Sequence, residues 1–209
     1  MKKIQEILSK YNIKVLKSLE KEGNSYIYTA ILSSSSVVIF KGKESSAVSI
    51  FPCDISRKKN LHILSLKILE EILKVLGIEG KDKGIVEYYD NLGNILGVAA
   101  VCTENMRYIG INAYSSREDL ESKNIERILE EVRRFPDVEE ILYHTFGEKD
   151  GYSMIIIGKK FVLTVHTWPE YRVLHMEEIS KNPSTFLKRF ERVLKDFNIF
   201  SLTMIGKYY

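Results

Sequence analysis

The sequence has little cysteine, and what it has is widely spaced. Cys53 and Cys102 are the only two cysteines among 209 residues, and neither belongs to a cluster with metal-ligand spacing. This argues against a disulfide scaffold and against a zinc module. No apolar run approaches the about 20 residues of a membrane-spanning helix, and residues 1–6 lack the apolar core of a signal peptide. We therefore expect a cytoplasmic protein with no membrane partner.

A strong excess of one charge is also lacking. The chain has 31 basic and 28 acidic residues, interleaved along its length, for a net charge of +3. Nothing in this balance calls for a nucleic acid, although it is compatible with a weakly bound anion. The composition, 44% hydrophobic and 28% charged, is typical of globular proteins, and the length suits one large domain or two small ones.

What the sequence does have is a regular alternation of strand and helix patterns. Ser116 with Asp119 resembles a capping box, and Asn182 with Pro183 is typical of a helix start. The serine run at 33–36 predicts a hairpin loop. The predicted helices cover residues 3–11, 61–75, 116–135 and 182–197, and the predicted strands cover residues 13–19, 26–32, 37–40, 47–51, 85–89, 95–101, 108–114, 140–145, 153–157, 162–167, 172–177 and 202–205.

One passage occurs twice. Val37–Pro52 and Ile155–Pro169 each contain a strand, a Gly-Lys turn, a second strand and a proline, and we expect a helix to follow each. The repeat predicts an α+β fold in which two sheet-plus-helix units form an αββα-type layered sandwich. We expect a single domain, residues 1–209, built of an N-terminal repeat, 1–103, and a C-terminal repeat, 104–209.

Val162–Glu170 contains the only tryptophan and is the most informative stretch. Alternation places Thr164, His166 and Trp168 on one face of a strand that ends at Pro169, because proline has no amide donor for the ladder. A histidine near the rim of a sheet is suited to chemistry. A hydrogen-bonded structural histidine beside a packed tryptophan explains the same pattern, and the two readings stay open.

The string Thr-Val-His-Thr-Trp-Pro-Glu, residues 164–170, resembles the signature of the short, prokaryotic form of the S-adenosylmethionine decarboxylase family. The resemblance extends from about residue 108 to the C-terminus and, in the first half, is limited to Val37–Pro52. It implies a lyase that decarboxylates S-adenosylmethionine (AdoMet) in polyamine (spermidine) biosynthesis. It also implies a pyruvoyl cofactor, formed when a serine after a glutamate attacks its own backbone carbonyl and the chain breaks.

The resemblance assigns the self-cleavage residues to both repeats. In the short enzymes the cleaved serine lies five residues before the histidine, where this chain has Phe161, which offers no nucleophile. The first repeat has Glu44-Ser45, and the resemblance implies that Ser45 becomes the pyruvoyl group. His166 matches the processing histidine and Ser153 its partner serine, so His166 can remove the α-proton and Ser153 can stabilise the oxyanion.

The substrate residues transfer in the same way. Glu170 matches the glutamate that holds the ribose hydroxyls, and Phe146 lies near the aromatic residue that stacks on adenine. Trp168 adds an aromatic face suited to a purine or a sulfonium cation. The family's catalytic cysteine has no clear match, because Cys53 follows Ser45 too closely.

These departures leave a second hypothesis, an uncleaved pseudoenzyme that binds a nucleoside-type ligand or regulates an active decarboxylase. Either protein could act as a homodimer or pair with a decarboxylase paralogue. No metal is predicted. The other histidines, His62, His144 and His175, fit helix-surface or sheet-rim positions, and Lys159-Lys160 fits a solvated hairpin tip.

Overall fold

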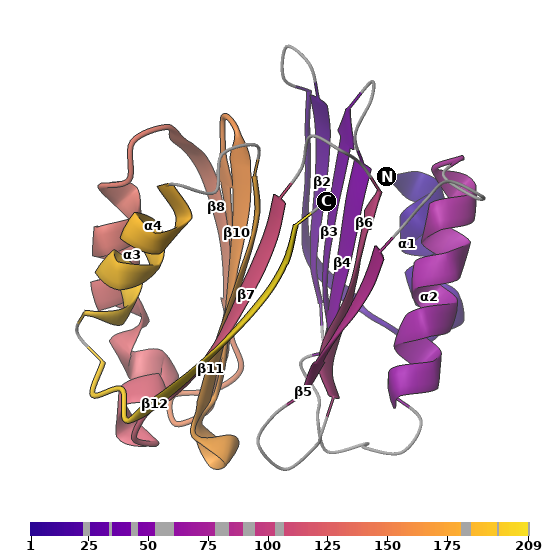
Figure 1. Cartoon of the computed structure of the whole chain (residues 1–209). Coiled ribbons are helices and arrows are strands. Elements are labelled where there is room, and N and C mark those ends of the chain that lie inside the picture. The colour runs from indigo at the N-terminus through magenta and orange to yellow at the C-terminus, as the bar shows by residue number, and fades with distance from the viewer. Residues whose placement is uncertain are drawn as a thin grey trace. The chain divides into compact units, whose positions relative to one another are not determined.

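The computed structural model consists of two compact units, residues 1–106 with Tyr209 and residues 107–208. The structure describes residues 1–22, 26–33, 35–42, 46–52, 61–77, 84–89, 95–102, 107–180, 185–195 and 197–208. Figure 1 shows the helices and strands of each unit.

The first unit is a six-stranded antiparallel sheet with two helices on one face (Figure 1). The strand order is β1-β2-β3-β4-β6-β5, so the first four strands form a meander. Its elements are α1 (Lys2–Lys10), β1 (Val15–Glu22), β2 (Tyr26–Ser33), β3 (Ser35–Gly42), β4 (Ser46–Pro52), α2 (Leu61–Val75), β5 (Gly84–Tyr89) and β6 (Ile95–Cys102).

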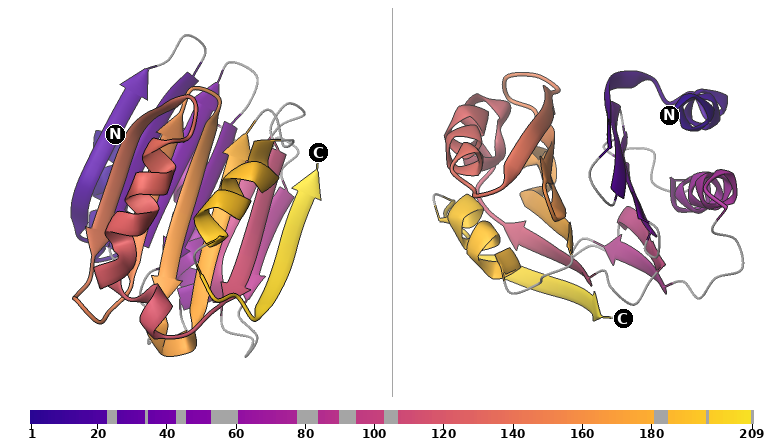
Figure 2. Two further views of the ribbon diagram at one scale, coloured as in Figure 1. Left: turned by 90° about the vertical axis from the view of Figure 1, so that its left-hand side faces the viewer. Right: turned by 90° about the horizontal axis from the view of Figure 1, so that it is seen from above.

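The second unit is also a six-stranded antiparallel sheet, in the order β12-β7-β11-β10-β9-β8. Its two α-helices cover one face of this sheet, as the second view of Figure 2 shows. Its elements are β7 (Arg107–Tyr114), the 3-10 helices η2 (Glu118–Leu120) and η3 (Ser122–Asn124), α3 (Ile125–Arg133), β8 (Val138–Thr145), β9 (Tyr152–Gly158), β10 (Phe161–Trp168), η4 (Pro169–Tyr171), β11 (Val173–Ser180), α4 (Phe186–Leu194) and β12 (Ser201–Tyr208).

Each unit has its own apolar core between its sheet and its helices. In the first unit, successive turns of α1 and α2 place apolar side chains on one face of each helix, and Ile7, Leu69 and Ile72 lie in one core with Ile39 of β3. In the second unit, the stripe Ile125, Ile128, Leu129 and Val132 of α3 packs with every second residue of the central strands, including Leu163 and Val165 of β10. Residues on the other face of β10, among them His166, therefore point away from α3 and α4.

These elements confirm the α+β class predicted from the sequence. The prediction that both units form one layered domain stays a prediction. Within the described residues, no helix has both the length and the apolar character that crossing a membrane would require.

The predicted repeat is out of register by one strand. The sequence pattern aligned β3–β4 with β9–β10, but β10 is followed by η4 and β11, and only then by α4. Strand order gives another alignment, because α1 and the meander β1–β4 correspond to α3 and the meander β8–β11. β3 therefore takes the place of β10. The shared Gly-Lys turn and terminal proline misled the sequence alignment because such residues end many hairpins.

Three local predictions, two helix caps and one loop, have different outcomes. The Ser116 hydroxyl accepts a hydrogen bond from the Asp119 amide at 3.2 Å, but Asp119 belongs to η2, whose N-cap is Arg117, and α3 begins only at Ile125. The loop predicted at 33–36 is shorter, because β2 continues to Ser33 and β3 begins at Ser35. The predicted cap at Asn182 and Pro183 lies outside the described residues.

Gly151, next to β9, provides a test of how tightly the second unit packs. A Cβ on Gly151 would lie 2.0 Å from the backbone oxygen of Thr167, which cannot move without shifting β10. We expect Gly151→Ala to lower the free energy of unfolding by about 1–3 kcal/mol. The measurement is urea unfolding followed by fluorescence of Trp168, the only tryptophan and a residue of the second unit.

Gly147→Ala is the matched control. Its Cβ would meet only the Asp150 side chain, with Oδ2 at 2.2 Å and Cγ at 3.1 Å, and this side chain can rotate away. Equal losses of stability in both variants would contradict the close approach at Gly151.

Candidate functional site

The predicted self-cleavage residues Glu44 and Ser45 lie outside the described residues, as does Cys53. Their partners in the second unit are described. The site that follows is therefore built from the second sheet alone.

His166 and Ser153 are brought together by strand pairing. The two residues lie directly opposite one another in the antiparallel ladder between β10 and β9. His166 Nδ1 is 2.9 Å from Ser153 Oγ, a hydrogen bond in which the hydroxyl donates whenever Nδ1 carries no proton. Both side chains are buried, with 1% of each exposed. The Trp168 ring lies beside His166, with 5.9 Å between ring centroids.

The polar row continues across the sheet. His166 is paired with His175 of β11, and His175 is paired with Asn112 of β7. His175 Nδ1 lies 2.6 Å from Asn112 Oδ1, so this nitrogen carries the proton and donates to the amide oxygen. On the other side, Ser153 is paired with His144 of the edge strand β8. Four adjacent strands thus place Ser153, His166, His175 and Asn112 in one buried row.

Burial keeps both central imidazoles neutral. It lowers the pKa of His166 from 6.5 to about 3. It also lowers the pKa of His175 well below its ordinary value, and the neighbouring His166 lowers it further. At physiological pH each ring can therefore accept and donate hydrogen bonds without carrying charge.

The predicted substrate residues differ in exposure. Glu170 is exposed in η4, the single turn between β10 and β11, while Trp168 at the end of β10 is buried. Phe146, just after β8, is 41% exposed and packs edge-on against His144 at 5.0 Å between ring centroids. Glu170 and Trp168 are close to His166 along the chain, whereas Phe146 lies beside His144 of the edge strand β8.

His175 is the residue that the sequence prediction placed wrongly. It was expected at a helix surface or sheet rim, but its side chain is fully buried within the sheet. A sequence signal was available, because His175 stands among the apolar residues Val173, Leu174 and Met176, a run typical of a strand that is buried on both faces. His144 does lie at the rim, on the edge strand β8, and Lys159 and Lys160 form an exposed hairpin tip as predicted. The side chain of His62 lies outside the described part of α2.

The corrected repeat alignment changes the counterpart of Phe161. Phe161 is the first residue of β10, and the first residue of β3, the topologically matching strand, is Ser35. Ser45, in contrast, comes after β3 and before β4 in the sequence, and the corresponding connection in the second unit, between β10 and β11, contains Glu170. Strand order thus adds Ser35 to the candidate serines of the first unit.

No protein-family model matches this chain, and no curated protein matches it in sequence. Among solved structures, it is similar to the crystal structure of the adenosylmethionine decarboxylase from Aquifex aeolicus VF5, with a TM-score of 0.43 and 14% sequence identity. The similarity covers 51% of this chain and 91% of that chain. A likeness of this size establishes neither family nor activity.

No group of three or more His, Cys, Asp or Glu side chains in the described ranges is arranged to hold a metal ion. The chemistry available in the polar row is proton transfer and hydrogen bonding by neutral groups.

The buried histidines predict a dependence of stability on pH. Their pKa values are lower in the folded chain than the about 6.5 expected in the unfolded chain. Below that pH the unfolded chain binds more protons, so the free energy of unfolding falls between about pH 6.5 and pH 3. We expect up to about 1.4 kcal/mol per pH unit for each histidine, measured by urea unfolding with Trp168 fluorescence.

The double variant His166→Gln/His175→Gln is the comparison. It keeps hydrogen-bonding groups of similar size but cannot take up these protons. An unfolding free energy that declines as steeply in the variant as in the original chain would show that other groups cause the pH dependence.

Proposed function

We propose that this chain is a pyruvoyl-dependent decarboxylase of the AdoMet decarboxylase type, acting in cytoplasmic polyamine (spermidine) biosynthesis. The observation that carries the proposal is the buried hydrogen bond between His166 and Ser153, at 2.9 Å. The resemblance of the sequence assigns these two residues to one task, self-cleavage. Cross-strand pairing supplies the contact that this task requires.

In the proposed reaction, His166 and Ser153 assist self-cleavage. The neutral imidazole can accept the α-proton of the cleaved residue, and the Ser153 hydroxyl can donate to the oxyanion of the acyl shift. A pKa near 3 makes His166 a weak base. Self-cleavage occurs only once in each chain, so a weak base is sufficient for it, whereas a fast catalytic cycle would require a stronger base.

The pyruvoyl group would be formed from a serine of the first unit and would supply the electron sink for decarboxylation. Ser45, with Glu44 before it, is the serine that the sequence resemblance favours. Strand order favours Ser35, because β3 corresponds to β10. The two positions yield different fragments, so one experiment distinguishes them.

Substrate recognition is proposed for the end of β10 and the turn after it. The Glu170 carboxylate can accept hydrogen bonds from two ribose hydroxyls of an AdoMet-like substrate, and it is exposed to receive them. Aromatic faces at Trp168 and Phe146 suit the adenine ring and the sulfonium cation.

One observation favours the alternative, an uncleaved pseudoenzyme that binds a nucleoside-type ligand or regulates a decarboxylase paralogue by pairing with it. Phe161 occupies the position of the cleaved serine, is only 3% exposed, and packs under the Arg189 guanidinium at 4.0 Å. The cleavage position of the second unit has thus become part of its packed core.

Intact mass spectrometry of the purified full-length chain tests the proposal. Cleavage before Ser45 gives fragments 1–44 and 45–209, and cleavage before Ser35 gives fragments 1–34 and 35–209. We expect serine-to-alanine substitution at the cleaved position to abolish the fragments. His166→Ala should slow their appearance by about 100-fold or more, the usual contribution of a positioned acid–base group.

Ser153→Ala should slow cleavage as well, whereas Ser122→Ala, another buried serine of the second unit, should not. A chain that stays whole after long incubation would refute the decarboxylase and leave the pseudoenzyme.

Ligand binding provides a separate test that does not require cleavage. Trp168 reports directly on the proposed site, so we expect AdoMet to change its fluorescence in a saturable way. Glu170→Gln should weaken binding about tenfold or more, because it removes a charged hydrogen-bond acceptor. The matched control is Glu148→Gln, which changes an exposed carboxylate in the β8–β9 loop. Equal weakening by both variants would remove Glu170 from the site.

A further inference from the structure

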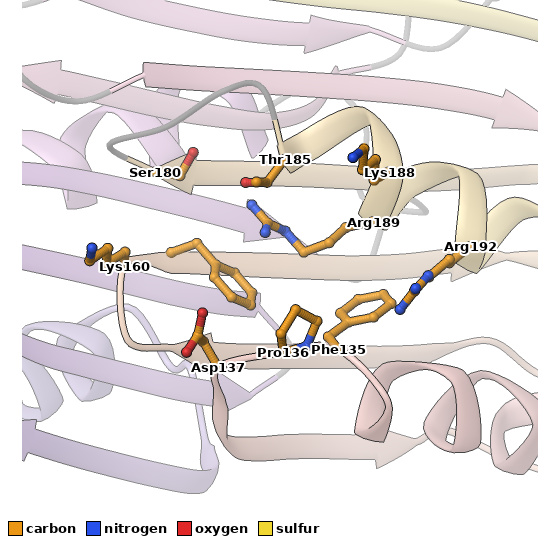
Figure 3. Close-up of a pocket in the computed structure, with 10 residues that line it drawn as sticks. Phe135, Pro136, Asp137, Lys160, Ser180, Thr185, Lys188, Arg189 and Arg192 are labelled. Atoms are coloured by element: carbon orange, nitrogen blue, oxygen red, sulfur yellow. The ribbon is translucent and has the colours of Figure 1, made fainter.

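The helix-covered side of the second sheet contains a cavity that the proposed decarboxylase site does not use. Its volume is about 310 Å³, and it lies where α4, the β9–β10 turn and the segment after α3 meet (Figure 3). We call it the α4 pocket. Its lining residues are Phe135, Pro136, Asp137, Lys160, Phe161, Ser180, Thr185, Lys188, Arg189 and Arg192. His166 and Ser153 lie on the opposite face of the sheet.

The lining of the α4 pocket is strongly basic. Four of its side chains are cationic and only Asp137 is acidic. Lys188, Arg189 and Arg192 follow one another at spacings of one and three residues along α4, which places Arg189 and Arg192 on adjacent turns of one helix side. Lys160 reaches the pocket from the β9–β10 turn, so the cations come from two separate elements.

Arg189 is the fixed part of this lining. Its Nε donates to Glu178 Oε2 at 2.6 Å, and one of its terminal nitrogens, Nη2, donates to Oε1 of the same carboxylate. Its guanidinium also stacks on the Phe161 ring, 4.0 Å from the centroid. Because Glu178 is buried and neutralises Arg189, this pair forms a rigid wall and adds little net charge.

The remaining cations are available to a ligand. Lys160, Lys188 and Arg192 are exposed, and within the described ranges no carboxylate lies at ion-pair distance from any of them. Arg192 contributes to lowering the pKa of Glu131, but the Glu131 carboxylate is itself paired with Arg134 and Lys195. The Asp137 carboxylate is 3.7 Å from Lys159 Nζ, outside the pocket lining, which offsets part of its charge. The pocket therefore presents an excess of positive charge that favours a dianion over a monoanion.

The rest of the lining is apolar. Phe135 and Phe161 are 4% and 3% exposed, and Pro136 follows Phe135 shortly before β8 begins. Figure 3 shows the Phe135 ring and Pro136 side by side, with Arg192 beyond Phe135. A ligand that combined a dianionic group with a planar apolar group would contact both kinds of surface. A volume of about 310 Å³ is at the small end of ligand pockets.

We propose that the α4 pocket binds a small phosphate monoester with a planar apolar group. The phosphate binds Lys188 and Arg192 of α4, and the planar group packs on Phe135 and Pro136. Lys160, which lies at the other end of the lining from Arg192 in Figure 3, adds positive charge to the pocket. Lysine and arginine are the usual phosphate ligands of proteins. This site is independent of the proposed decarboxylase chemistry.

Isothermal titration calorimetry of the full-length chain with phenyl phosphate tests the proposal. We expect saturable binding with a Kd at or below about 1 mM in low salt, about tenfold weaker binding of inorganic phosphate, and about tenfold weaker binding of benzoate. Lys188→Glu and Arg192→Glu should each weaken phenyl phosphate about tenfold or more. Lys149→Glu makes the same charge change at an exposed residue away from the pocket and should leave the Kd within about twofold.

Urea unfolding of each variant, followed by Trp168 fluorescence, confirms that the second unit is folded before binding is compared. The absence of saturable binding by the original chain would overturn the proposal. So would a loss with Lys149→Glu as large as that with Arg192→Glu, which would indicate unspecific attraction. Binding of benzoate as tight as that of phenyl phosphate would overturn the assignment to phosphate.

Discussion

The register of the antiparallel ladder β9–β10–β11–β7 determines where the chemistry of the second unit lies. It sets Ser153 opposite His166, His166 opposite His175, and His175 opposite Asn112. A slip of one residue on any of these strands would turn its polar side chain to the face covered by α3 and α4. The apolar residues Leu163, Val165 and Met176 prevent such a slip, because the slip would remove them from the core. The core on one face thus fixes the polar row on the other.

Buried polar groups are compensated differently on the two faces of this sheet. On the face with His166, Ser153 and Asn112 bond to the two imidazoles across strands, and burial lowers the pKa of each imidazole and so holds it unprotonated. On the helix side, an ion pair is buried. Nε and one terminal nitrogen of the Arg189 guanidinium donate to the Glu178 carboxylate. Removing one member of such a pair would leave a buried charge without compensation, which is far more costly than the pair itself. The Arg189 pair therefore anchors α4 to β11.

Periodicity in the sequence was sufficient for most of the fold. Apolar runs and helical spacings located β7 to β11 and all four α-helices. Prediction failed for the burial of single residues. β11 is buried along its whole length, as β9 and β10 are, so His175 is covered although the sequence prediction placed it at a surface. The repeat was misaligned because turn residues recur at every hairpin, whereas strand order depends on contacts between distant segments that one sequence does not reveal. The His166–Ser153 pair was predictable only through resemblance to a family, since no local spacing specifies a partner thirteen residues away.

β6 of the first sheet and β7 of the second occupy the same place, next to an edge strand, but they come from different ends of their units. In the first unit β6 is made last, whereas in the second unit β7 is made first and later pairs with β11 and β12. During synthesis the first sheet can close as soon as β6 has emerged. β7, in contrast, leaves the ribosome with both edges unpaired and stays so until nearly the whole chain is available. An unpaired strand is a template for association with other chains, so the interval before β11 arrives is the point at which a nascent chain is most exposed to aggregation.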